Sequence, residues 1–216
     1  MDSLHIVIAL GPVATYLVVL GLINLSSRPL LTTGARDVAS LAIALLGLIV
    51  AGPMNLFLVE EAAVLYGAWV WLIMLVAYGL VVLLIVLLLR PRLVVYNITV
   101  EQLQPLVAEI ATRLDPDAQW AGDGLAMPRL GVQLHLEASP LLKNVQLVSS
   151  GPEQSLAGWR QFQVALNADL RRVHTGPNQL GVGIFGVGIL FIMVMTFVLA
   201  GDPAGTVQAV NEMLRR

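Results

Sequence analysis

The stretch from Ala62 to Leu89 constrains the fold most strongly, because its 28 residues carry no charged side chain. It ends at Arg90-Pro91-Arg92. As an α-helix it would be ~42 Å long at ~1.5 Å per residue, and the hydrocarbon core of a bilayer is ~30 Å thick. The stretch therefore predicts a helix that spans a membrane.

Three other apolar stretches are long enough to span as well. The four expected spans lie at about residues 4–26, 38–59, 62–89 and 175–201. The first follows Asp2 rather than a basic segment and is longer than a signal-peptide core, so we expect it to remain uncleaved. Apolar residues make up 57% of the chain and charged residues 12%, against about 25% charged in soluble domains. The sequence predicts a polytopic α-helical membrane protein with four transmembrane helices.

Arginines predict the orientation, because cytoplasmic loops are enriched in Lys and Arg. They flank the spans on the segments that we assign to the cytoplasm: Arg28, Arg36, Arg90, Arg92, Arg171 and Arg172. The loop between the second and third spans instead carries Glu60 and Glu61. We expect a multi-pass protein of a bacterial inner (plasma) membrane, with its N-terminus outside and residues 91–174 in the cytoplasm. The short amphipathic tail at 202–216 would then lie outside, although Arg215 and Arg216 favour the opposite side.

Two Gly-Pro pairs interrupt the spans at a similar expected depth. They are Gly11-Pro12 in the first span and Gly52-Pro53 in the second. Proline kinks a helix by removing a backbone hydrogen bond, so the pairs predict either an outward-facing cleft or contacts between neighbouring helices. The residues of such a cleft are Gly11, Pro12, Gly52, Pro53, Asn55, Glu60 and Glu61. We favour helix packing, because no ionisable residue lies deep in any span, as proton and ion pathways usually require.

Four glycines lie in the first half of the fourth span: Gly181, Gly183, Gly186 and Gly188. Their spacing matches the dinucleotide-binding pattern G-x-G-x-x-G, but that pattern has meaning only between a strand and a helix of a βαβ unit. Within a membrane helix, small residues allow close approach of a second helix. We therefore expect a helix-packing interface, formed with another helix of this chain or with another protein.

Residues 91–174 have the pattern of an inserted α+β two-layer domain with an antiparallel sheet and two helices. A Val- and Ile-rich strand at 93–98 is followed by a helix that Thr99 caps. Gly122-Asp123-Gly124 predicts a hairpin. Apolar and polar residues then alternate from Leu130 to Ala138, a further strand lies at 144–149, and a helix is expected at 153–173.

The alternating strand directs Gln133, His135 and Glu137 to one exposed sheet face. His135 and Glu137 could form a metal or acid–base pair, but zinc requires three or four ligands, and a solvated strand face explains both residues equally well. Cysteine is absent from the sequence, which excludes disulfides and thiolate catalysis. The sequence therefore predicts no catalytic residue, metal site or cofactor.

These observations favour a non-catalytic integral membrane protein, a structural or accessory subunit of a larger complex with a cytoplasmic protein-interaction domain. The expected partners are the lipid bilayer, other membrane subunits or further copies of the chain, and a cytoplasmic protein. Nucleic acid is not expected, because basic residues are not clustered as a nucleic-acid surface requires. Two alternatives stay open: a small transporter or channel component that uses the kinked helices, and a membrane-embedded enzyme that acts on lipid.

Overall fold

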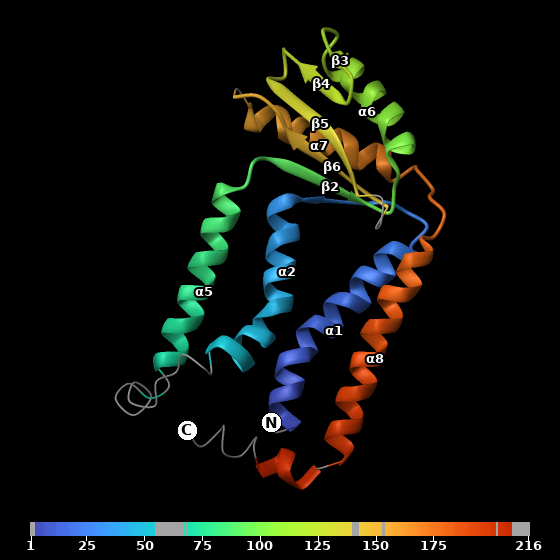
Figure 1. Cartoon of the computed structure of the whole chain (residues 1–216). Coiled ribbons are helices and arrows are strands. Elements are labelled where there is room, and N and C mark those ends of the chain that lie inside the picture. Colours follow the sequence, from blue (N-terminus) through green and yellow to red (C-terminus); the bar gives the residue numbers. More distant parts are fainter. Residues whose placement is uncertain are drawn as a thin grey trace. The chain divides into compact units, whose positions relative to one another are not determined.

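A computed structural model describes residues 3–54, 67, 69–139, 143–152, 154–201 and 203–208 (Figure 1). The chain divides into two compact units. The helix unit is Met1–Leu20, Val38–Leu88 and Ile184–Arg216, and the sheet unit is Gly21–Asp37 and Leu89–Gly183. The sheet unit thus contains the first inter-helix segment in addition to the inserted region that the sequence indicates.

Four long apolar helices confirm the main feature of the sequence pattern. They are α1 (Ser3–Leu25), α2 (Gly34–Ile49), α5 (Trp69–Leu88) and α8 (Gln179–Gly201), and a π-helical turn, η1 (Val50–Met54), follows α2. Each is long and apolar enough to cross a membrane, α2 together with the start of η1 as the span Gly34–Gly52. Helix α8 begins later than expected because Asn178 caps it, accepting a hydrogen bond from the backbone N–H of Leu180 at 3.2 Å.

A six-stranded antiparallel sheet forms the centre of the sheet unit, in the order β1-β2-β6-β5-β4-β3. Its strands are β1 (Leu30–Thr33), β2 (Arg92–Tyr96), β3 (Gln119–Ala121), β4 (Gly124–Met127), β5 (Val132–Ser139) and β6 (Asn144–Ser149). The last four form a meander that returns β6 to the side of β2. The expected hairpin joins β3 and β4, with Gly122 at φ +61° in its turn.

Two helices, α6 (Val100–Leu114) and α7 (Leu156–Leu170), pack against the sheet and complete one hydrophobic core. Alternate strand residues enter this core, as the period of two predicts. The fully buried residues include Leu103, Ile110, Leu134, Leu147, Phe162 and Leu166. Strand β5 begins at Val132 rather than at Leu130, because residues 128–131 form a turn in which Gly131 has φ +63°.

Strand β1 is the feature that the sequence pattern did not indicate. It lies in the short segment between α1 and α2 and pairs with β2, with Leu30 opposite Tyr96 and Thr33 opposite Leu93. Leu31 packs against the hydrophobic core. The first inter-helix segment is therefore the edge strand of the sheet, and the last turn of α1 and the first turn of α2 belong to the same compact unit.

Candidate functional site

The outward face of β5 presents the polar side chains that its alternation predicts. Gln133 and Glu137 are exposed, and the His135 side chain is 36% exposed. His135 Nε2 and Glu137 Oε1 lie 2.7 Å apart, so the two residues hydrogen-bond to each other. Within the described part of the chain, no group of three or more His, Cys, Asp or Glu side chains could hold a metal ion.

The same sheet face differs at its β1–β2 end, where it is buried. Val94 is 1% exposed and Tyr96 is 8% exposed, although neither belongs to the hydrophobic core between the sheet and α6 and α7. The Tyr96 hydroxyl donates a hydrogen bond to Asp37 Oδ1 in the first turn of α2. The exposed part of this face is therefore its β5 portion, and Tyr96 in the β2 portion contacts the first turn of α2.

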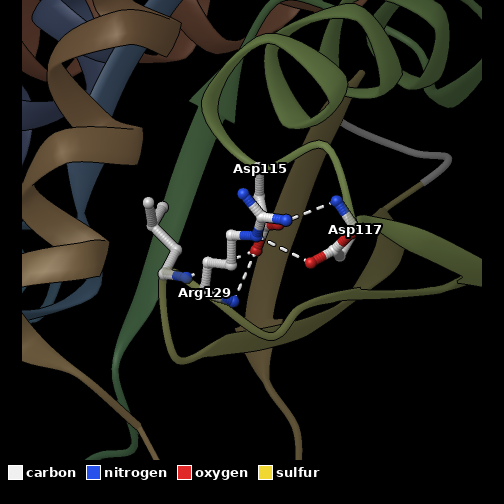
Figure 2. A network of polar contacts seen from close by, with 4 residues as sticks. Asp115, Asp117 and Arg129 are labelled. Atoms are coloured by element: carbon white, nitrogen blue, oxygen red, sulfur yellow. Dashed lines mark hydrogen bonds and ion pairs between the residues drawn. The ribbon is translucent and has the colours of Figure 1, made fainter.

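Asp115, the residue that follows α6, is a buried carboxylate that the sequence analysis did not single out. It is 0% exposed and accepts backbone hydrogen bonds from Asp117 at 3.0 Å, Arg129 at 2.7 Å and Leu130 at 3.3 Å. The Arg129 side chain in turn contacts Asp117 Oδ2 at 2.6 Å (Figure 2). These bonds fasten the turn before β5 to the end of α6. Asp115 therefore supports the fold, because its acceptor oxygens are used by the backbone.

Asn97 joins three segments that are distant in the sequence. Its Nδ2 donates to the Ser26 carbonyl at 2.5 Å and to Thr175 Oγ1 at 3.1 Å. The Thr175 backbone N–H donates to the Ser27 carbonyl at 3.0 Å. Asn97 is 1% exposed and has φ +59°, a conformation that asparagine tolerates better than most residues. These contacts, which we call the asparagine clasp, bind the segment after α1 and the segment before α8 to the end of β2.

Two of the four glycines in α8 face α1, as close helix packing requires. A Cβ at Gly181 would lie 2.9 Å from the Asn24 Cβ, and one at Gly188 would lie 2.9 Å from the Val18 backbone nitrogen. A Cβ at Gly183 or Gly186 would have no atom within 4 Å. The glycine-mediated contact thus occurs within the chain at two positions, and the other two are open in the described structure.

The Gly-Pro pairs have different surroundings. Pro12 lies inside α1, where its missing N–H leaves the Ile8 carbonyl without its usual helical donor. Gly47 of α2 approaches that carbonyl so closely that a Cβ there would lie 2.0 Å from the oxygen. The contact supports the packing interpretation of the first pair. Gly52-Pro53 lies in η1, while Asn55, Glu60 and Glu61 lie outside the described residues.

At the start of α6, hydrogen bonding lowers the pKa of the exposed Glu101 carboxyl, chiefly through the Thr99 side chain and also through its own backbone. This is helix capping rather than acid–base chemistry. The described residues therefore offer a polar sheet face, a buried carboxylate and the asparagine clasp, and the last two are engaged in holding the fold. Comparisons of the chain with models of protein families, with curated proteins and with solved structures found no match.

Proposed function

We propose that this chain is a multi-pass membrane protein that serves as a non-catalytic structural or accessory subunit of a larger membrane complex. Its four long apolar helices would span the inner membrane, and the sheet unit would lie on the cytoplasmic side, as the arginines next to the helix ends favour. The exposed part of the sheet face, with Gln133, His135 and Glu137, would receive a protein partner.

One observation carries this proposal: the first inter-helix segment supplies strand β1 of the sheet. Strand β1 follows the last residue of α1 by five positions and precedes α2 directly, and β2 begins four positions after Leu88 of α5. The asparagine clasp adds the segment that leads to α8. These short, hydrogen-bonded connections support an accessory role in which one chain contacts both membrane subunits and a cytoplasmic partner.

The distribution of ionisable groups supports this role over transport. In the described parts of the four helices, Asp, Glu, His, Lys and Arg side chains occur only near the ends, at His5, Arg36 and Asp37. Proton relays and many ion pathways place such groups deep in the bilayer. The close approach of Gly47 to the Ile8 carbonyl also supports a packing role for Pro12.

Native mass spectrometry of the chain extracted from its own membrane tests the proposal. We expect a complex of fixed stoichiometry that Glu137→Arg weakens, because the substitution reverses the charge on the proposed partner surface. Glu109→Arg is the matched control, since Glu109 is an exposed acid on α6. A chain that is always recovered alone, or a complex equally sensitive to both substitutions, would overturn the proposed surface. A phosphatase fusion at Gly151 that is active in the periplasm would overturn the orientation.

A further inference from the structure

Three arginines gather where α2 and β2 begin, and we call them the arginine cluster: Arg36, Arg90 and Arg92. The pairing of Thr33 with Leu93 brings Gly34 beside Arg92, and a Cβ on Gly34 would lie 2.3 Å from Arg92 Cγ. Arg36 follows two residues later in the first turn of α2, and Arg90 precedes Arg92 by two residues. At ~3.5 Å or less per residue along each chain segment and ~5 Å between facing strand residues, the three backbone positions lie within about 20 Å.

No arginine of the cluster forms an ion pair in the described part of the chain. Arg36 and Arg90 are exposed and have no carboxylate partner there. Arg92 donates from Nη1 to Gln146 Oε1 at 3.3 Å, and its buried Nε has no acceptor. The neighbouring carboxylate, Asp37, accepts a hydrogen bond from Tyr96.

Arginines elsewhere in the sheet unit show the contrast. Arg113 lies 2.6 Å from Asp169, and Arg129 lies 2.6 Å from Asp117. The first pair joins α6 to α7, and the second joins the turn after α6 to the turn before β5. Within the described residues, Arg113 and Arg129 are thus ion-paired and the three arginines of the cluster are not.

The position of the arginine cluster next to the ends of two apolar helices indicates which kind of anion it would bind. Arg90 follows the last residue of α5 by two positions, and Arg36 lies at the start of α2. If these helices span a membrane, as the proposed function requires, both side chains reach the level of the lipid headgroups, where long basic side chains extend toward the phosphates. Guanidinium groups bind phosphate oxygens through paired, charge-assisted hydrogen bonds. We propose that the arginine cluster binds the headgroup phosphate of an anionic phospholipid.

Lipid titration of the full chain in detergent, followed by native mass spectrometry, tests this assignment. We expect phosphatidylglycerol to bind more tightly than phosphatidylcholine. Arg36→Gln and Arg90→Gln should each weaken phosphatidylglycerol binding about fivefold, the equivalent of ~1 kcal/mol per basic residue near an anionic surface. Arg160→Gln is the matched control, because Arg160 is an exposed arginine on α7 outside the arginine cluster, and it should leave binding unchanged.

Three results would overturn the proposal. They are equal binding of the two lipids, an equal loss of phosphatidylglycerol binding in Arg160→Gln, and binding of inorganic phosphate alone with the same dependence on Arg36 and Arg90. The last would indicate a site for soluble phosphate. Alkaline extraction separates this failure from that of the proposed function. A chain released from the membrane would refute membrane insertion, whereas a retained chain without lipid preference would refute only the arginine cluster as a lipid site.

Discussion

Gly47→Ala tests how α1 and α2 pack at the carbonyl that Pro12 leaves free. The added Cβ would lie 2.0 Å from the Ile8 oxygen and 3.0 Å from the Ala9 oxygen. Both contacts are with backbone, so no side-chain rotation relieves them, and the two helices must separate locally. Overpacking of this kind costs about 1–3 kcal/mol. A lost Cα–H···O contact between Gly47 and the Ile8 carbonyl adds about 0.5–1 kcal/mol.

We therefore expect Gly47→Ala to lower the free energy of unfolding by about 2 kcal/mol. Reversible unfolding of the full chain by dodecyl sulfate in mixed micelles, followed by circular dichroism, measures this quantity. Gly79→Ala on α5 is the matched control, because a Cβ at Gly79 meets no atom within 4 Å. This control should leave stability unchanged or raise it slightly, since alanine favours helix more than glycine does.

A double-mutant cycle with Pro12→Ala separates the two contributions. Alanine at position 12 supplies the N–H that the Ile8 carbonyl lacks, so the Cα–H···O part of the Gly47 effect, about 0.5–1 kcal/mol, should disappear. The steric part should persist. If Gly47→Ala proved as stable as the unsubstituted chain and as Gly79→Ala, the close approach of α2 to α1 would be refuted.

The sheet unit gives three further predictions. Asp115→Ala should lower the free energy of unfolding by about 3 kcal/mol, because three backbone N–H groups lose their acceptor. Asp117→Ala should lower it by less than about 1 kcal/mol, because the ion pair of Asp117 is exposed. Chemical denaturation of the full chain measures both changes. Asn97→Ala should be less stable than Asn97→Gly by about 1 kcal/mol, since both lose the hydrogen bonds of the asparagine clasp but only alanine is strained at positive φ; equal thermal stabilities would contradict this. The pKa of Glu101 should lie below its ordinary value and rise in Thr99→Ala. A carboxyl whose pKa is depressed in the folded state stabilises the fold above the unfolded-state pKa, and this contribution is lost as the pH falls through the folded-state pKa. Thr99→Ala should therefore make the free energy of unfolding less sensitive to acid. NMR titration of the Glu101 carboxyl checks the shift, and an unchanged pKa in Thr99→Ala would contradict it.

The parts of the structure that sequence could predict are those with a strong local signal. An uncharged run indicates a long apolar helix by itself, as in α5. The alternation in β5 placed Gln133, His135 and Glu137 on the outward face, where the structure has them. Thr99 precedes the first residue of α6, as a capping residue should.

The parts that sequence could not predict depend on distant partners. Strand β1 has four residues, too few for a clear periodic signal, and its partner strand lies about 60 positions away in the chain. The roles of Asn97 and Gly47 likewise depend on segments that only the folded chain brings together. A single asparagine or glycine carries no local sign of such a contact.

A disulfide between β1 and β2 tests most directly the central claim that the first inter-helix segment is part of the sheet. The chain has no cysteine, so Thr32→Cys combined with Val94→Cys introduces a single pair. These residues are directly opposite each other, and facing residues of antiparallel strands have Cβ atoms about 4.5–5.5 Å apart, close enough for a disulfide after a small adjustment. The control pair, Thr33→Cys with Val94→Cys, is out of register by one residue and directs its side chains to opposite faces. Mild oxidation in native membranes should convert the first pair to a faster-migrating, reducible species on gels and leave the control pair unlinked. Equal cross-linking of both pairs, or none in the first, would contradict the attachment of β1 to the sheet.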